Sequence, residues 1–158
     1  LPPPSGGPRG WHNDGARTSA DTGHTLGARS TGGVAIGDVD GDGDHAAWDA
    51  NYGQANKVWT NDGTAGFTDS AQVLGTGNSY GVALGDLDGD GDLDAYAANN
   101  GQANRVWLNN GTGIFSDSGQ SLGTGDSRTV ALGDLNGDGD LDAFIANNGQ
   151  ANRAWVNT

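Results

Sequence analysis

Short apolar runs, separated by turns rich in Gly and Asn, recur along the whole chain. In the central part, the alternation of apolar and polar positions predicts four strands, at residues 80–85, 93–98, 104–108 and 114–121. Asn-Asn-Gly and Gly-Thr-Gly segments between the strands are typical of tight hairpin turns. No stretch has the period of an amphipathic helix, and Gly is too frequent for long helices. The pattern therefore predicts an all-β protein.

This pattern repeats every 48 residues. Residues 85–107 and 133–155 differ at only four of 23 positions, and residues 37–59 form a more divergent copy. A repeat of about four short strands is typical of a β-propeller blade. We therefore predict a propeller domain over residues 11–158, after a flexible tail at residues 1–10. Its parts are a half-unit at 11–36, whole units at 37–84 and 85–132, and a half-unit at 133–158.

The chain holds about three blades, fewer than the four to eight of a typical closed propeller. The C-terminal half-unit needs strands like those of residues 11–36 to complete its sheet. Either the two ends of one chain meet, or the ends of different chains pair. We expect a homo-oligomer that closes the ring between chains, with a dimer favoured and a trimer as the alternative. A piece of a longer array of repeats is a further alternative.

Three Asp-rich loops occupy the same place in the repeat. Oxygen atoms at loop positions one, three and five can converge on one hard cation, and Gly at position six permits a sharp turn. A backbone carbonyl at position seven and a carboxylate at position nine complete the expected shell, and an apolar residue at position two (Val39, Leu87 or Leu135) should point into the core. The predicted metal-ligating residues are Asp38, Asp40, Asp42 and Asp44 in the first loop, Asp86, Asp88, Asp90, Asp92 and Asp94 in the second, and Asp134, Asn136, Asp138, Asp140 and Asp142 in the third.

The composition favours calcium as the cation. All 20 acidic residues are Asp, the net charge is −13, and both Cys and Met are absent, so the loops offer Asp and Asn oxygen atoms and no sulfur ligand. We expect about three Ca²⁺ ions per chain. The first loop should bind more weakly because Ala46 replaces the carboxylate at position nine, and Asp49 lies too far along the next strand to substitute for it.

The same charge argues against two classes of partner. A surface this acidic repels nucleic acid and anionic lipid, and no apolar run is long enough for a membrane helix. We therefore expect no nucleic-acid binding and no membrane insertion.

The Asp-rich loop, the strand after it and the segment at residues 104–115 (NRVWLNNGTGIF) together resemble the FG-GAP/VCBS repeat family. This family includes the blades of integrin α-subunit propellers and of several propeller lectins. The resemblance covers residues 11–158. It implies a β-propeller with calcium loops between the first two strands of each blade, and it places the family's ligands on the loop residues named above.

Aromatic and amide side chains that recur in the repeat are candidates for ligand binding. They are Trp59, Trp107, Trp155, Gln102 and Asn104. The Trp side chains could stack on sugars or pack between blades, and we favour packing. The amides could bind sugar hydroxyls or hold a turn by bonding the backbone. Tyr52, Tyr80 and Arg128 break the repeat symmetry and are candidates for surface specificity.

These observations lead to a non-catalytic, calcium-binding module for recognition or adhesion, secreted or at the cell surface. Its expected partner is a glycan or an extracellular protein. A carbohydrate-binding lectin with sites between blades is the second hypothesis, and a structural, self-assembling propeller fragment is the third. The three His residues share no repeat position and gather no evident acid or nucleophile, so we predict no enzymatic activity.

Overall fold

The computed structural model describes residues 9–13, 15 and 19–158, so most of the predicted tail at residues 1–10 lies outside the described part. The described residues form strands and no helix, and thus no helix capable of crossing a membrane. The strands are β1 (Arg9–Asn13), β2 (Ser19–Thr25), β3 (Thr31–Gly37), β4 (Ala46–Asn51), β5 (Lys57–Asn61), β6 (Phe67–Asp69), β7 (Ser79–Gly85), β8 (Asp94–Asn99), β9 (Arg105–Asn109), β10 (Phe115–Asp117), β11 (Ser127–Gly133), β12 (Asp142–Asn147) and β13 (Arg153–Trp155).

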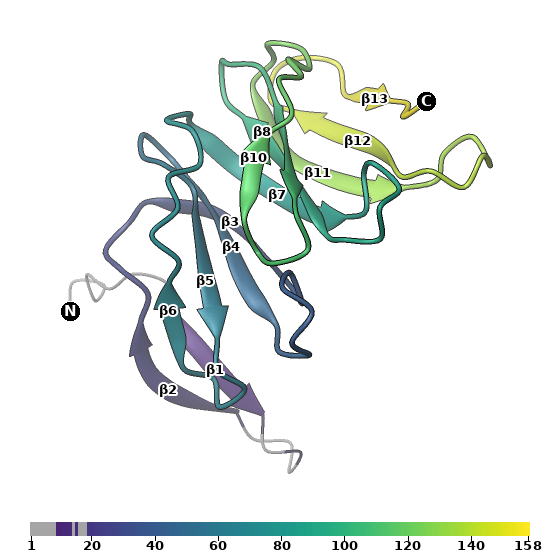
Figure 1. Cartoon of the computed structure of the whole chain (residues 1–158). Helices are drawn as coiled ribbons and strands as arrows, with labels where there is room; N and C mark the ends of the chain where they lie inside the picture. Colours follow the sequence, from purple (N-terminus) through teal and green to yellow (C-terminus); the bar gives the residue numbers. More distant parts are fainter. Residues whose placement is uncertain (1–8, 14, 16–18) are drawn as a thin grey trace.

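These strands form antiparallel sheets that follow the order of the chain. Two sheets have four strands, in the orders β3-β4-β5-β6 and β7-β8-β9-β10, and a third has the order β11-β12-β13. The all-β prediction is confirmed, and the sheets are consistent with propeller blades. They stand in a row with β1–β2 at one end and β13 at the other (Figure 1), so the described residues of one chain do not close a ring.

The sheets repeat one another in register as well as in order. Gly85 pairs with Asp94 at the start of the second sheet, and Gly133 pairs with Asp142 at the start of the third. The β1–β2 pair forms a separate two-stranded sheet in which Trp11 pairs with Asp21. Because Trp59 pairs with Asp69 in the same way, β1–β2 corresponds to the outer two strands of a blade.

Neighbouring sheets pack closely through their inner strands. A Cβ atom built on Gly32 of β3 would lie 2.8 Å from the Cα atom of Tyr80 on β7, so this position admits no side chain. Trp48 of the first sheet is fully buried in a cluster that contains Ala95 and Ala97 of the second. Tyr96 takes the same place between the second and third sheets, where it packs with Val130 and Ile145. Each large aromatic side chain therefore fills the junction with the next sheet.

Hydrogen bonds also join the first and second Asp-rich loops to the sheet that follows each of them. The Nδ2 atom of Asn109, at the end of β9, donates to the carbonyl oxygen of Val39 at 2.7 Å. Asn157 donates to the carbonyl oxygen of Leu87 at 2.9 Å in the same manner. Both bonds span 70 residues of sequence, and they attach the Asp-rich loop of one blade to the C-terminal end of the third strand of the next, or to the residues just after it.

One buried carboxyl group departs from the repeat. Asp49 on β4 is 1% exposed and accepts a hydrogen bond from Nε1 of Trp59 at 2.8 Å. Burial raises the pKa of Asp49, against the smaller lowering effects of the Trp59 hydrogen bond and the charge of Arg29. The folded chain therefore holds a proton on Asp49 more tightly than the unfolded chain does.

We expect the substitution Asp49→Asn to raise the melting temperature at neutral pH, because it removes a buried charge and keeps an acceptor for Trp59. The gain should shrink as the pH falls toward the ordinary carboxyl range, where the wild-type group is itself protonated. Thermal melts from about pH 7 down to about pH 4 measure this difference. Asp62→Asn is the control of opposite sign, since hydrogen bonds from Thr64 lower the pKa of Asp62. A gain that grows at acid pH would contradict the interpretation.

Candidate metal-binding loops

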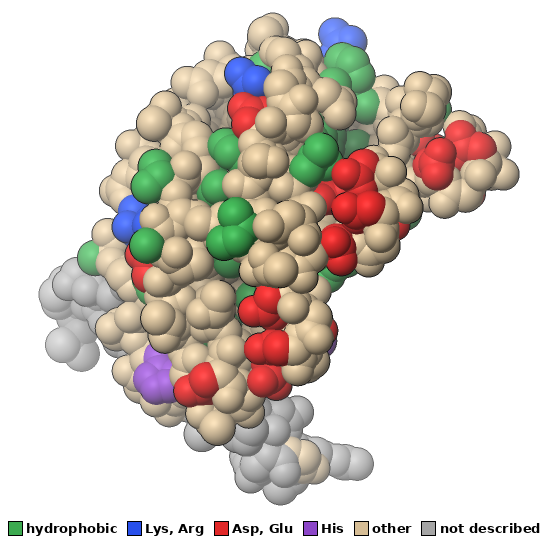
Figure 2. Space-filling model, in the orientation of Figure 1, with side chains coloured by type: hydrophobic (Ala, Val, Ile, Leu, Met, Phe, Trp, Pro, Cys, Tyr) green, Lys and Arg blue, Asp and Glu red, His purple; other side chains and the backbone are tan. Residues whose placement is uncertain are grey.

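The three Asp-rich loops lie between β3 and β4, β7 and β8, and β11 and β12. Acidic side chains gather over them along one side of the molecule (Figure 2). The first Asp of each loop organises the turn. The carboxylate of Asp86 accepts hydrogen bonds from the backbone nitrogen atoms of Gly89 at 2.7 Å and Gly91 at 3.0 Å. Asp38 and Asp134 accept the equivalent pairs of bonds, so all three loops have one conformation.

Carboxylate groups converge in the first two loops. One oxygen atom from each of Asp38, Asp40 and Asp42 lies within 4.8 Å of the others, and the same holds for Asp86, Asp88 and Asp94. Positive φ angles of 91° at Gly43 and 93° at Gly91 make these tight turns feasible, because residues with a side chain rarely adopt that conformation. Both groups consist of oxygen donors alone, which suits a hard divalent cation.

The carboxylate at position nine is held rigidly. Asp94 is fully buried and accepts hydrogen bonds from the backbone nitrogen atoms of Leu87 at 2.9 Å and Asn109 at 2.8 Å. Asp142 is 1% exposed and accepts the equivalent pair. In the first loop this position is Ala46, which is 2% exposed. Asp49 points away from the loop toward Trp59, so it does not replace the missing carboxylate.

Other predicted ligands are placed differently. In the third loop, Nδ2 of Asn136 donates to Asp138 at 2.7 Å, so an amide stands where the other loops have a carboxylate. The side chains of Asp44 and Asp92 turn toward the hairpin between the third and fourth strands: a Cβ atom on Gly63 would lie 2.6 Å from Asp44 Oδ2. In these two loops, the backbone carbonyl group is the candidate ligand at position seven.

Burial, and to a smaller extent neighbouring negative charge, raises the pKa of one carboxyl group in each of the first two loops. Burial is the largest cause of the raised pKa of Asp94, and the charges of Asp88 and Asp90 add to it, while the two backbone hydrogen bonds oppose it. Burial, followed by the charge of Asp42, likewise raises the pKa of Asp40. By contrast, backbone hydrogen bonds, the largest from Gly137, lower the pKa of Asp134. Each of the first two loops therefore holds one carboxylate, Asp40 or Asp94, whose charged form is less favourable than that of a free carboxylate.

The candidate ligand-binding Trp residues lie mainly in the packing between blades. Trp59 and Trp107 are each 8% exposed. Trp155 is half-buried and packs against the cluster of side chains between the second and third sheets, which includes Tyr96 of β8 and Val106 of β9. Asn104 is also buried, and its Oδ1 accepts a hydrogen bond from the backbone of Asn99 at 2.8 Å. Gln102 is exposed. The structure thus gives Asn104 a role in its turn and leaves Gln102 at the surface.

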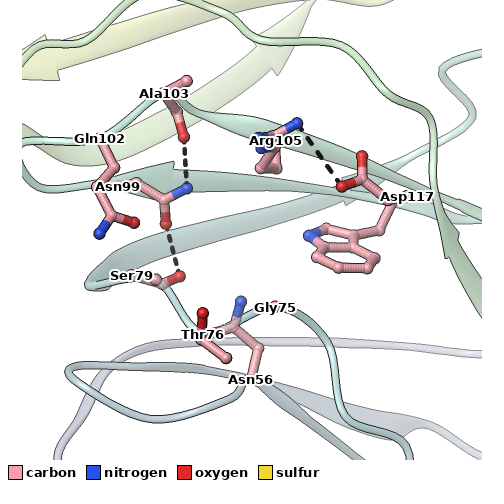
Figure 3. A pocket seen from close by; sticks show the side chains of 11 residues that line it. Asn56, Gly75, Thr76, Ser79, Asn99, Gln102, Ala103, Arg105 and Asp117 are labelled. Carbon is pink, nitrogen blue, oxygen red and sulfur yellow. Dashed lines mark hydrogen bonds and ion pairs between the residues drawn. The ribbon is translucent and has the colours of Figure 1, made fainter.

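A polar pocket of about 220 Å³ lies where the first sheet meets the second. Gln102, Asn99 and Ser79 line one part of it, and Arg105 forms an ion pair with Asp117 in another (Figure 3). The equivalent pocket at the next junction has only about 10 Å³. Ile145 lines that smaller pocket at the repeat position that Ala97 holds in the second sheet, and the larger side chain accounts for lost space.

The three residues that break the repeat symmetry meet on the surface. The rings of Tyr52 and Tyr80 lie 5.2 Å apart, and the guanidinium group of Arg128 lies 4.3 Å from the centre of the Tyr80 ring. Arg128 also pairs with Asp126 at 3.1 Å, and Nδ2 of Asn148 donates to the same carboxylate at 3.0 Å. Comparison of the repeats indicated the first three residues, and Asp126 also differs from its repeat counterparts, Ser30 and Asn78, so the same comparison could have indicated it.

Comparison with known proteins agrees with this architecture. The family model of the FG-GAP-like repeat matches residues 46–97 and 86–145, which together span more than half of the chain. No curated protein matches the chain in a sequence search. The matched segments contain the second Asp-rich loop, the strands on either side of it and the whole third loop. The chain therefore belongs to the FG-GAP-like repeat family.

Proposed function

We propose that this chain is a non-catalytic, calcium-binding propeller module that serves recognition or adhesion outside the cell, secreted or at the cell surface. The observation that carries the proposal is the convergence of Asp86, Asp88 and Asp94 within 4.8 Å of one another. Carboxylates held this close to one another repel, and a bound cation relieves that repulsion. In extracellular modules, calcium sites of modest affinity suffice because calcium there is abundant.

Calcium suits these loops better than other divalent cations. Ca²⁺ accepts six to eight oxygen ligands in flexible geometry, whereas Mg²⁺ requires a stricter octahedron and retains several waters. The loops offer carboxylates, an amide at Asn136 and backbone carbonyl groups, and the chain contains no Cys. Belonging to the FG-GAP-like family supports the same ion, since repeats of this family generally bind calcium.

Position nine provides a matched test of the metal site. We expect Asp94→Ala to weaken calcium binding at the second loop by about tenfold or more, because it removes a charged, preoriented ligand. Ala46→Asp should have the opposite effect and increase the calcium affinity of the first loop. The backbone nitrogen atoms that orient Asp94 have counterparts there, at Val39 and Asn61. Isothermal titration calorimetry with Ca²⁺, and with Mg²⁺ for comparison, measures both changes. Asp117→Asn, outside the loops, is the control, and unchanged titrations in both position-nine variants would reject these sites.

The candidate surface for recognition is the row formed by Tyr52, Tyr80 and Arg128. The exposed ring of Tyr52, with the half-buried Tyr80 and Arg128 beside it, supplies apolar area and hydrogen-bond donors together, as binding sites on proteins commonly do. These residues differ from their counterparts in the other repeats, which suits a surface selected for one ligand.

A propeller lectin is the alternative function, and the pocket between the first two sheets favours it. Gln102 and Arg105 line this pocket with polar groups beside Trp107, a combination that suits sugar hydroxyls and a sugar face. The expected result of a glycan array is then saturable binding that a free monosaccharide inhibits and that Gln102→Ala lowers severalfold. Gln150→Ala changes the same repeat position beside the smaller pocket and should leave binding intact. A chain that binds calcium but no glycan or protein would favour the third hypothesis, a structural module.

A further inference from the structure

The last sheet exposes apolar side chains that are buried at the same repeat positions elsewhere. Leu135 is 54% exposed and Phe144 is 46% exposed. Their counterparts in the first sheet, Val39 and Trp48, are 3% and 0% exposed because the second sheet covers them. The expectation that Leu135 points into the core was therefore wrong, because none of the sheets that the structure describes packs against it. Leu135, Phe144 and the half-exposed Val156 form what we name the C-terminal face.

The first sheet exposes the complementary surface at the opposite end of the row. Val34 and Ile36 on β3 are 49% and 65% exposed. In the third sheet, the counterpart of Val34 is Val130, which is 8% exposed and packs with Tyr96 of the preceding sheet. Leu132, the counterpart of Ile36, is also partly buried there. We name Val34 and Ile36 the N-terminal face.

These two faces are the two halves of a junction that the chain builds twice internally. At the first internal junction, a methyl group of Leu93 would lie 2.7 Å from a Cβ atom built on Gly37, so it fills the space above that glycine. Leu141 lies in the same way above Gly85. Above Gly133 of the last sheet, no atom lies within 4 Å of the corresponding point. The C-terminal face thus has the shape of a junction without its second half.

The strands at the two ends are complementary as well. The sheet β11-β12-β13 has three strands, and β1–β2 has the register of the outer strands of a blade. In a head-to-tail arrangement, β2 of a second copy would take the fourth position of that sheet. Since β1 and β13 hold the same repeat position, only one of them can pair with β12 of a given sheet.

We propose that the C-terminal face of one copy docks on the N-terminal face of a second copy, and that two copies close a ring head to tail. The junction is the one already formed within the chain, which is why a second copy is the occupant that fits. Apolar faces of this kind are costly to leave in water. This proposal concerns assembly and does not depend on the recognition surface or on a glycan.

Light scattering coupled to size-exclusion chromatography, in calcium, tests the assembly. We expect the wild-type chain to be a dimer. Phe144→Asp and Ile36→Asp should each give a folded monomer, because a carboxylate would be buried at the junction. Val73→Asp is the matched control: Val73 is 69% exposed on neither face, and the polar Ser121 stands at its counterpart, so this variant should remain a dimer. Circular dichroism melts confirm that each variant is folded.

Mixing the two monomeric variants tests the head-to-tail arrangement directly. The Ile36→Asp chain keeps an intact C-terminal face, and the Phe144→Asp chain keeps an intact N-terminal face. An equimolar mixture should therefore recover dimers that contain one chain of each kind and one intact junction. An arrangement that joins two C-terminal faces would instead leave Ile36→Asp dimeric alone. A monomeric wild-type chain, an assembly that survives both substitutions, or a mixture without dimers would overturn the proposal.

A third variant should strengthen the assembly. His45 stands at the repeat position of Leu93 and Leu141, so in a second copy it would lie above Gly133. His45 is exposed in the single chain. His45→Leu restores the apolar contact of the internal junctions and should lower the dissociation constant by roughly tenfold. Sedimentation equilibrium measures this change, and a constant that stays the same or rises would argue against the docking mode.

Discussion

Removal of calcium should lower the melting temperature of this chain by about 15 °C or more. Each ion that binds only the folded chain stabilises it by about 2.7 kcal/mol when its concentration is about a hundred times the dissociation constant. For a domain of this size, each kcal/mol corresponds to roughly 2–4 °C of melting temperature. The emptied loops would also contain the carboxylates of Asp86, Asp88 and Asp94 within 4.8 Å without a counter-charge.

Differential scanning calorimetry in millimolar calcium and in excess chelator measures this shift. Added magnesium is the control for general screening of the net charge of −13, and it should restore little of the lost stability. Melting temperatures that coincide with and without chelator would refute metal-coupled stability. Such a result would not bear on the proposed dimer, which light scattering tests separately.

Replacement of Trp48 by Ala should cost about 3–5 kcal/mol of unfolding free energy. Trp48 is fully buried and packs against Ala95 and Ala97 of the next sheet, so its loss leaves a cavity at the first junction. The core of this chain consists largely of Ala and Val, and few other side chains are large enough to fill that space. Urea unfolding, followed by circular dichroism, gives the change in free energy.

The chain carries its own control for this experiment. Phe144 holds the repeat position of Trp48 and is 46% exposed. Phe144→Ala should therefore change the stability of the single chain by less than about 1 kcal/mol. The comparison is made at a concentration low enough for the chain to be monomeric. Equal losses in the two variants would contradict the view that the next sheet buries this position.

The strands could be predicted from the sequence because each apolar run is short and bounded by turn residues. The strand predicted at residues 80–85 matches β7, which begins one residue earlier. The strand predicted at residues 114–121 ends at Asp117. There the side chain of Asp117 accepts a hydrogen bond from the backbone of Gly119, whose φ of 80° turns the chain. A local side-chain bond of this kind ends the strand although the pattern of residues continues.

The carboxylates that gather in the first two loops could be anticipated from the sequence, because they lie within nine positions of one another. Spacing alone did not reveal that Asp94 is held by Asn109, which lies 15 residues further along the chain. Nor did it reveal that Tyr80 and Arg128 meet, since this contact requires two sheets to be side by side. The repeat showed that Trp48 and Phe144 hold equivalent positions. Only the arrangement of the sheets showed that Trp48 is buried and Phe144 is exposed.

The hydrogen bonds from Asn109 to Val39 and from Asn157 to Leu87 each join an Asp-rich loop to the sheet that comes later in the sequence. Because the first and second loops are attached in this way, an ion held in either of them would protect the next blade against local opening. Order would then pass from neighbour to neighbour, as in a one-dimensional lattice with nearest-neighbour coupling. Filling the first loop would slow amide exchange in β9, and the weakest ion site would limit how far cooperativity extends along the array.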